Sequence, residues 1–505
     1  MNNPFNAFTE GGKNVRYYIA GLVALLAVAI YLAVSQGVHG VGFPLDDAWI
    51  HQTYARNLVA FQEWAFIPGQ PSAGSTAPLW SILLSAGYLL NLSPYFWTFL
   101  LGTVSLAALA ICGEMWFRRV GGGVKSLVPW VGIFLAGEWH LTWSAASGME
   151  TTLFALIIIV VFYLLTKKER GWIVGLLIGI SVWIRPDGIT LLGPALFQYF
   201  LECGSWKERG KKSASLILPG LIPVTGYLIF NQVISNTWLP NTFFAKQAEY
   251  AISQQIPILD RFFSLIELPL IGAGVLLLPG FLFFIWKSVK NRAWDRLAVE
   301  LWWLGYILVY AFRLPVTYQH GRYLFPAMPV FFIGGMVGLV EISRALHLRN
   351  HGTQGDNQEP RWLRLGRFGW TAAIAALWLS MIAVGAFTYA QDVAIIDTEM
   401  VATSRWIAAN TPAGAVIGAH DIGALGYFGN HRILDLAGLV SPDVIPFIRD
   451  ETALGNYLTQ HGASFLMTFP GWYPKLVQNR QVLFQTSGKF SPSAGGENMS
   501  VFQWP

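Results

Sequence analysis

Long apolar runs recur along the chain, and short gaps rich in lysine and arginine separate many of them. Each run is apolar enough for a membrane-crossing helix, and several are short, near the lower limit of length for a crossing. The pattern therefore predicts a polytopic α-helical membrane protein with about eleven transmembrane helices, at 16–36, 95–117, 126–146, 150–166, 170–186, 188–203, 213–233, 263–286, 297–313, 324–343 and 369–390.

The basic gaps indicate how these helices are oriented. Under the positive-inside rule the gaps richest in Lys and Arg are cytoplasmic, and they are Arg118–Lys125, Lys167–Arg170, Lys207–Lys212, Lys287–Arg296 and Arg344–Arg367. A further apolar stretch, 77–91, agrees with this orientation only if it does not cross the membrane. We therefore expect a cytoplasmic N-terminus, a transmembrane domain at 1–390, and a first extracytoplasmic loop at 37–94 that contains interfacial helices.

The tail, 391–505, differs from the rest of the chain. It has no spanning run, and short β-branched stretches such as AVIGAH, RILDLAG and SFLMTF alternate with helical ones such as TEMVATSRWIAAN. This alternation predicts a small α/β domain. Following the last predicted span, the domain is expected on the extracytoplasmic side.

Composition excludes several classes of protein. Only 12% of the residues are charged and 54% are hydrophobic, whereas soluble domains carry about 25% charged residues. Disordered, nucleic-acid-binding and single soluble globular proteins are excluded on this ground. The two cysteines, Cys112 in an apolar run and Cys203 beside a basic gap, offer no disulfide framework and no thiolate metal site.

An acidic pair follows the first apolar run. Asp46 and Asp47 come about ten residues after it, at the expected membrane surface. Adjacent carboxylates near apolar surface raise the pKa of at least one, as a general base for a hydroxyl requires. The alternative is an N-cap and first-turn acid for the helix AWIHQTYARNL. This helix has an apolar face and a polar face with His51 and Arg56, so we expect it at the membrane interface.

Other polar residues fall in connections on the same side of the predicted membrane. Each alone is explained by a local ion pair, a cap or a snorkelling cation. Together they predict an outward-facing polar cavity with charges of both signs. The residues are Glu150 in SGMETT, Arg185 in IRPDG, Asn241 and Lys246 in NTWLPNTFFAK, His320, Arg322 and Tyr323 in VTYQHGRYLFP, and His420 and Asp421 in the tail's AHDIGALGYF.

These motifs, in this order, resemble the GT-C superfamily of polyprenyl-phosphate-sugar glycosyltransferases. The likeness is greatest to actinobacterial terminal arabinofuranosyltransferases, and more distant to protein O-mannosyltransferases and aminoarabinose transferases. It covers the whole chain and rests on DDAWIHQTYARNL, SGMET, RPDG, PNTFFAK, GRYLFP and AHDIGALGYFGNHRILDLAGL. The resemblance implies an inverting enzyme of the bacterial plasma membrane. Such an enzyme moves a sugar, for example the pentofuranose arabinose, from a polyprenyl phosphate to an extracytoplasmic glycan, lipid or protein.

The resemblance also implies residue roles. Asp46 is the expected base, with Asp47 orienting the acceptor or sharing the proton, and the two roles are open to exchange. Lys246, Arg322 and Arg185 are the expected ligands of the donor phosphate. The remaining candidates are expected to contact substrate, namely His51, Arg56, Glu150, Asn241, His320, Tyr323, His420 and Asp421.

No metal is required by this scheme, because phosphate is already a good leaving group and needs only cations. A divalent cation stays an alternative, because Asp46, Asp47 and Glu150 offer carboxylates to a hard ion.

Two further interpretations compete with this one. The first is a mannosyl- or aminoarabinosyl-type transferase of the same superfamily with a protein or lipid acceptor, since no residue specifies the sugar. A transporter or a non-catalytic envelope-assembly protein is of another class. Transporters place charged sites near the bilayer midplane within related repeats, whereas here the charges gather at one surface and no repeat is visible. An enzyme is therefore the favoured interpretation.

Overall fold

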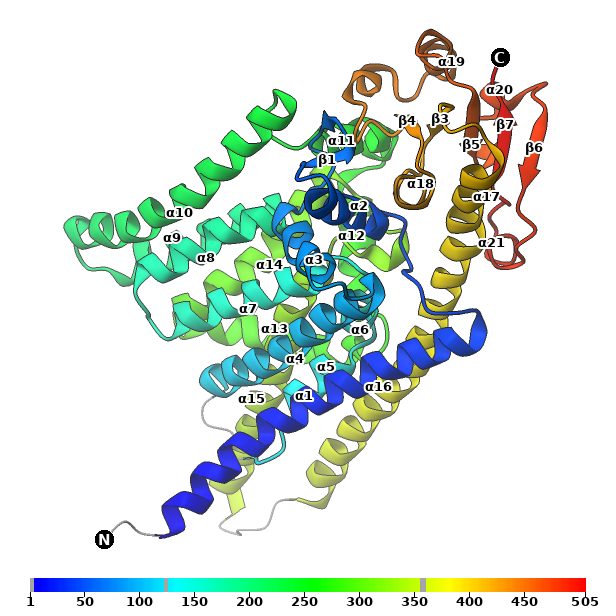
Figure 1. The fold of residues 1–505 in the computed structure, drawn as a ribbon. Helices are drawn as coiled ribbons and strands as arrows, with labels where there is room; N and C mark the ends of the chain where they lie inside the picture. Colours follow the sequence, from blue (N-terminus) through cyan, green and yellow to red (C-terminus); the bar gives the residue numbers. More distant parts are fainter. Residues whose placement is uncertain (1–3, 122–125, 355–359) are drawn as a thin grey trace.

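Helices make up most of the chain, and a five-stranded sheet lies near its C-terminus (Figure 1). The computed structural model describes residues 4–121, 126–354 and 360–505. The apolar runs fold as helices, because only a helix satisfies every backbone N–H and C=O within one segment in lipid. These helices are α1 (Pro4–Val38), α4 (Pro94–Val120), α5 (Trp130–Gly137), α6 (Trp139–Ala146), α7 (Thr151–Thr166), α8 (Gly171–Ile184), α9 (Leu192–Glu202), α10 (Trp206–Ser235), α12 (Ile258–Ile266), α13 (Gly274–Lys290), α14 (Trp294–Arg313), α15 (Met328–Gln354) and α16 (Arg361–Ile396).

The helices differ in how far they can reach across a bilayer. Among the described residues, five helices are long and apolar enough to cross, or six if the bent pair α12 and α13 forms one span. Other predicted runs form shorter helices, such as α7 with 16 residues and α8 with 14. The protein is thus a helical multi-pass membrane protein, and the predicted count of eleven spans stays a prediction.

Two predicted spans are broken. The run 126–146 divides into α5 and α6 at Glu138, whose carboxylate caps α6 by accepting a hydrogen bond from the Leu141 amide over 3.1 Å. The run 263–286 is shared between α12 and α13, which meet at 109°. Hydropathy depends on residue composition and does not record the direction of the helix axis. Neither break is therefore visible in the apolar pattern.

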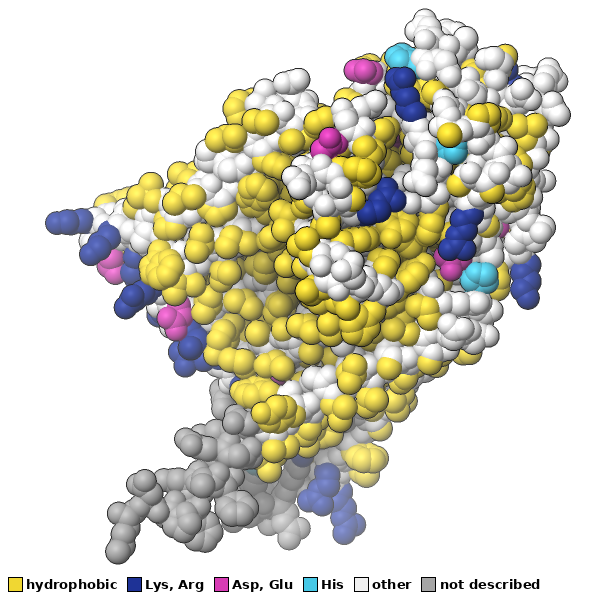
Figure 2. Space-filling view, in the orientation of Figure 1, with side chains coloured by type: hydrophobic (Ala, Val, Ile, Leu, Met, Phe, Trp, Pro, Cys, Tyr) yellow, Lys and Arg dark blue, Asp and Glu magenta, His cyan; other side chains and the backbone are white. Residues whose placement is uncertain are grey.

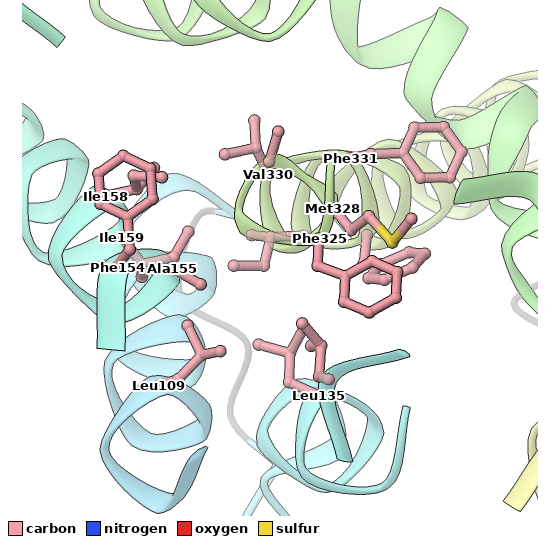
Figure 3. Packing of buried hydrophobic residues seen from close by; sticks show 14 of the residues in the cluster. Leu109, Leu135, Phe154, Ala155, Ile158, Ile159, Phe325, Met328, Val330 and Phe331 are labelled. Carbon is pink, nitrogen blue, oxygen red and sulfur yellow. The ribbon is translucent and has the colours of Figure 1, made fainter. Parts of the chain in front are cut away.

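The core of the helical body lies where α4, α5, α7 and α15 meet (Figure 3). Leu109, Leu135 and Phe154 approach Phe325 and Met328 there, and all five are at least 95% buried. Phe325 belongs to the turn that leads into α15, so this core supports the loop just before that helix.

Many of the Lys and Arg side chains in Figure 2 gather at its left and lower edges, away from the sheet, which lies at the upper right in Figure 1. A broad apolar band separates them from the sheet in Figure 2. This arrangement is consistent with membrane-spanning helices that carry the sheet on one side of the membrane.

The first loop contains α2 (Asp47–Ala60), a hairpin of β1 (Ala65–Ile67) and β2 (Gln70–Pro71), and α3 (Pro78–Leu89). The sequence predicts an interfacial α2 with an exposed polar face. In the structure that face is buried, because α2 packs between α3 and α18 (Gly423–Phe428). Gln52, for example, is fully buried and donates to the Thr98 hydroxyl over 2.7 Å.

The tail folds as a mixed α/β region, as predicted. The sheet order is β4-β3-β5-β7-β6, with β3 parallel to β4 and β5, and β7 antiparallel to β5 and β6. Its elements are α17 (Ala402–Asn410), β3 (Val416–Ala419), α18, β4 (Arg432–Asp435), α19 (Glu451–Gln460), β5 (Phe465–Thr468), α20 (Pro474–Val477), β6 (Val482–Gln485), α21 (Phe490–Ser493) and β7 (Ser500–Gln503).

One helical run joins the two regions. It extends without a break from Arg361 to Asn410, through α16, a π-helical turn and α17. The domain boundary predicted at 390/391 therefore falls inside α16.

Candidate active site

A cavity of about 410 Å³ lies where the N-terminal end of α2 meets α11 (Asn241–Glu249), α14 and the loop before α15. Leu439 of the tail also lines it. Apolar side chains such as Ile50, Ile189 and Phe243 form part of its wall. The cavity brings together these residues predicted from the sequence: Asp47, His51, Glu150, Arg185, Lys246, Arg322 and Tyr323.

Asp47 lies between two cations in the cavity. Its Oδ2 atom accepts a hydrogen bond from Arg322 Nη2 over 2.5 Å and is 3.9 Å from Lys246 Nζ. Lys246 also donates to the Tyr323 hydroxyl over 2.9 Å. Burial alone would raise the pKa of Asp47, but Arg322 and Lys246 hold that pKa well below its usual range. Asp47 is therefore ionised at neutral pH.

Arg322 has unused hydrogen-bonding capacity. It is 7% exposed, and its Nε and Nη1 atoms have no hydrogen-bond partner in the described part of the chain. Buried donors without partners are rare and are expensive to leave unpaired. A guanidinium in this state, lining a cavity, is suited to bind an anion.

Arg185, in contrast, has protein partners at every side-chain nitrogen. It donates to Glu150 over 3.3 Å, to Asp187 over 3.2 Å and to the Tyr310 hydroxyl over 2.8 Å. Glu150 and Asp187 also place two carboxylates beside the single positive charge of Arg185, which disfavours binding of an anion there. Arg185 is thus an organising residue for these groups, and less free than Arg322 to hold a phosphate.

Asp46 faces away from the cavity. Its carboxylate accepts hydrogen bonds from the backbone amides of Gly423, over 2.6 Å, and Ala424, over 2.8 Å. It makes no capping bond to α2 itself, so it caps α18 and not the helix that follows it. Burial, and next the neighbouring Asp421, raise the pKa of Asp46 to about 8. Asp46 joins the first loop to the tail.

Other predicted residues hold the first loop and α11 against the tail. Arg56 donates to the Tyr427 carbonyl over 2.7 Å, and Asn241 to the Leu439 carbonyl over 3.3 Å. These are backbone contacts between elements, so they set the position of α2 and α11.

A charged contact lies at the other end of α11. His420 lies 3.4 Å from Glu249, and Asp421 follows it in the chain. Altogether six predicted residues do not line the cavity: Asp46, Arg56, Asn241, His320, His420 and Asp421. A substrate contact by these six stays a prediction.

His320 lies outside the cavity, close to its wall. Its Nε2 atom is 2.8 Å from Asp392 Oδ2, in α16, and its ring lies against Trp139 and Trp143. Its neighbour Arg322 is the residue that reaches into the cavity.

Sequence reasoning missed part of the cavity wall. Asp187 accepts hydrogen bonds from the hydroxyls of Tyr306 and Tyr310, and Tyr310 lines the cavity with Arg313 and Gln247. The available signal was the spacing of the two tyrosines, four residues apart and so on one face of α14. The aromatic residues of that helix fit lipid contact equally well, which hid the polar role.

The described residues contain no group of three or more His, Cys, Asp or Glu side chains placed to hold a metal ion. The three carboxylates considered for a hard cation have separate partners: Asp46 binds α18, Asp47 binds Arg322, and Glu150 binds Arg185.

Most of the chain is similar in fold to several solved structures, although the sequences are at most 15% identical. It is similar to ArnT from Cupriavidus metallidurans bound to undecaprenyl phosphate, with a TM-score of 0.57 and 15% identity over 96% of this chain and 97% of that chain. It is also similar to the apo oligosaccharyltransferase of Archaeoglobus fulgidus, with a TM-score of 0.59 and 9% identity over 90% of this chain and 70% of that one.

A third similar structure is the Archaeoglobus fulgidus oligosaccharyltransferase AglB in complex with an inhibitory peptide and a dolichol-phosphate. Its TM-score is 0.54, with 10% identity over 88% of this chain and 69% of that chain. Residues 389–502 match a family described as a domain of unknown function (DUF8728). No curated protein sequence matches the chain. These comparisons show a shared fold, and the resemblance to arabinofuranosyltransferases stays a prediction.

Proposed function

We propose that the protein is an inverting glycosyltransferase that moves a sugar from a polyprenyl monophosphate to an acceptor hydroxyl. The observation that carries this proposal is the grouping of Asp47, Lys246 and Arg322 in one cavity of a GT-C-type fold. The carboxylate can accept the proton of an attacking hydroxyl. The two cations, one of which has unpaired hydrogen-bond donors, can bind the departing phosphate.

The phosphate of the donor binds to Lys246 and Arg322. Two cations stabilise the charge that develops on the leaving oxygen as the sugar becomes oxocarbenium-like. Arg322 offers Nε and Nη1 at no cost to its bond with Asp47. Arg185 contributes more weakly, because its donors are already used by Glu150, Asp187 and Tyr310.

Asp47 is the base in this scheme. The acceptor oxygen attacks the anomeric carbon from the face opposite the phosphate and forms the new glycosidic bond. The bond from that carbon to the phosphate oxygen breaks, polyprenyl phosphate leaves with the electron pair, and the hydroxyl proton passes to Asp47. The negative charge of a bound donor phosphate lies close to the Asp47 carboxylate and repels it, so the pKa of Asp47 rises once the donor is bound.

Asp46 has a positioning role in this proposal. The sequence favours Asp46 as the base and leaves the two roles open to exchange, and we propose that Asp47 is the base. The support is that Asp47 lines the cavity whereas the carboxylate of Asp46 is occupied by the amides of Gly423 and Ala424. Through these two hydrogen bonds, Asp46 fixes the position of α2 relative to α18 of the tail.

The finer features of the proposal come from the sequence motifs. The sugar is a pentofuranose such as arabinose, and the acceptor is an extracytoplasmic glycan, lipid or protein. The protein lies in the bacterial plasma membrane, with its N-terminus in the cytoplasm and its cavity and tail outside, because the gaps rich in Lys and Arg are expected on the cytoplasmic side.

Sugar transfer by the purified, detergent-solubilised protein tests the proposal. The donors are labelled polyprenyl-phosphate sugars that carry arabinofuranose, aminoarabinose or mannose, and the acceptor is a mixed envelope-glycan fraction. We expect transfer with inverted anomeric configuration from one donor. If the protein neither transfers any sugar nor binds undecaprenyl phosphate, the proposal is wrong and a transporter or assembly role is favoured.

A further inference from the structure

We infer that His320 and Asp392 form a tether that positions Arg322, so that both residues serve the donor-phosphate site without touching the substrate. This inference rests on the proposed function, and it adds two positioning residues to that site. The backbone just before Arg322 has an unusual conformation.

Three consecutive residues before Arg322 have left-handed backbone conformations. The φ angles of Gln319, His320 and Gly321 are 51°, 61° and 72°. A non-glycine residue in this region costs roughly 1–2 kcal/mol and is seldom followed by another. Such a turn persists only where surrounding contacts hold it. In this protein, contacts on two sides hold the turn.

One side of the turn is held by α16 and α6. His320 Nε2 donates to Asp392 Oδ2 over 2.8 Å, and Trp143 Nε1 donates to the same oxygen over 2.9 Å. The His320 ring lies edge-on to Trp139 and Trp143, with centroids 5.7 and 5.4 Å away. A single carboxylate oxygen thus fastens the turn to two helices.

The other side of the turn is held by packing. Gly321 lies so close to Leu268 that a side chain at this position would collide with it. The turn is therefore fixed between Leu268 and the His320–Asp392 pair. The next residue along the chain is Arg322, whose side chain projects into the cavity and reaches Asp47.

The tether acts at a distance from the substrate. The side chains of His320 and Asp392 are each 24% exposed, and neither lines the cavity. If His320 is removed, the turn is free to relax toward ordinary negative φ, and the direction in which Arg322 leaves the backbone changes. The expected consequence is a misplaced guanidinium with an intact cavity wall, and so weaker phosphate binding.

The test compares full-length wild type with His320→Ala, Asp392→Ala, the double variant, and His320→Gln. Glutamine places an amide donor near the position of the histidine Nε2 atom, and the adjacent Gln319 already has a left-handed φ of 51°, so His320→Gln is the rescue variant. His461→Ala is the matched control, because His461 bonds only within its own helix region, to the Tyr457 carbonyl.

The first readout is binding of undecaprenyl monophosphate, with no sugar and no acceptor present. We expect His320→Ala and Asp392→Ala each to weaken binding on the order of tenfold, since a small misplacement of a charged group is costly. The double variant should be no worse than either single variant. His320→Gln should recover most of the affinity, and His461→Ala should match wild type.

The second readout is kinetic. With wild-type enzyme active, the tether variants should raise the KM for donor and leave the KM for acceptor unchanged. Wild-type affinity in His320→Ala, additive losses in the double variant, or absence of rescue by glutamine would each overturn the tether.

The third readout needs no ligand and separates this inference from the proposed function. We expect Asp392→Ala to lower the unfolding temperature more than His320→Ala, because it also removes the Trp143 hydrogen bond, and the double variant to lower it by less than the sum of the two single variants. We also expect His320→Ala to have a smaller effect in an Arg322→Ala background. If wild type binds no undecaprenyl phosphate but these temperatures behave as expected, the proposed function fails and the tether stands. Additive temperature shifts would overturn the tether whatever the ligand results.

Discussion

Arg322 Nη2 and Asp47 Oδ2 lie 2.5 Å apart, and this contact joins residues 275 positions apart in the sequence. It places the proposed base against a proposed ligand of the leaving phosphate. The two groups neutralise each other in the absence of substrate, so donor binding redistributes charge within the cavity before any bond is broken.

Substitution at the acidic pair distinguishes the two carboxylates. Asp47→Asn should lower the transfer rate by about 10²- to 10⁴-fold, the usual contribution of a general base, with little effect on undecaprenyl phosphate binding. Asp46→Ala should leave two buried amides unpaired and lower the free energy of unfolding by about 1–3 kcal/mol. Initial rates and thermal unfolding of both variants check this. A folded Asp46→Asn that is as inactive as Asp47→Asn would return the base to Asp46.

Lys246 should contribute mainly through its charge. Lys246→Met keeps the length of the side chain and removes the cation, so the transfer rate should fall by about 10²- to 10³-fold. Lys246→Arg should retain much of the activity. Binding of undecaprenyl phosphate should weaken in the methionine variant and depend less on salt concentration. Equal activity of Lys246→Met and wild type would contradict a phosphate contact.

His420 should make stability depend on pH. Burial opposes its charge, but Glu249 and then Asp421 raise the pKa of His420 to about 9, above about 6.5 for an unfolded histidine. The stabilising contribution is therefore complete below about pH 6.5 and is lost as pH rises through about 9. Its size is at most about 3 kcal/mol.

The measurement is the unfolding temperature of wild type and His420→Gln between pH 6 and 10. Wild type should be the more stable protein at pH 6, and the difference should shrink toward pH 10. Asp46, Asp421 and Asp435 also have raised pKa values, so both proteins should lose stability as pH rises. A constant difference between the two would show that His420 is not charged in the folded protein.

Removal of divalent cations should leave the transfer rate unchanged. Lys246 and Arg322 already supply two positive charges where the phosphate leaves, so the reaction needs no metal as a Lewis acid. Transfer after dialysis against EDTA, with and without added Mg²⁺ or Mn²⁺, checks this. A large loss that either cation restores would place a metal at Asp47 or Glu150.

The sequence predicted the helical body well, because burial in lipid demands apolar residues over a full helix length. It could not predict the break at Glu138, which depends on a single carboxylate capping α6. Nor could it predict the 109° bend between α12 and α13. Both features depend on local hydrogen bonding and packing that hydropathy does not record.

The candidate site was predicted in part for a similar reason. Motifs in separate loops were expected to share a cavity, and the structure brings seven of the predicted residues to one cavity; their roles stay predictions. The direction of each side chain was not predictable. Neighbouring residues on a helix point about 100° apart, so only one of Asp46 and Asp47 can face the cavity. The choice depends on Gly423, which is 377 residues away from Asp46.

The unbroken helix from Arg361 to Asn410 makes the protein responsive to the bilayer around it. Its 50 residues correspond to a rod of about 75 Å at 1.5 Å per residue. A thinner or thicker bilayer changes the tilt of a spanning helix, and a rod of this length turns a tilt of a few degrees into a displacement of several ångströms at its far end. The tail would then shift relative to α2, which it grips through Asp46. We therefore expect the thickness of the bilayer to affect the geometry of the cavity.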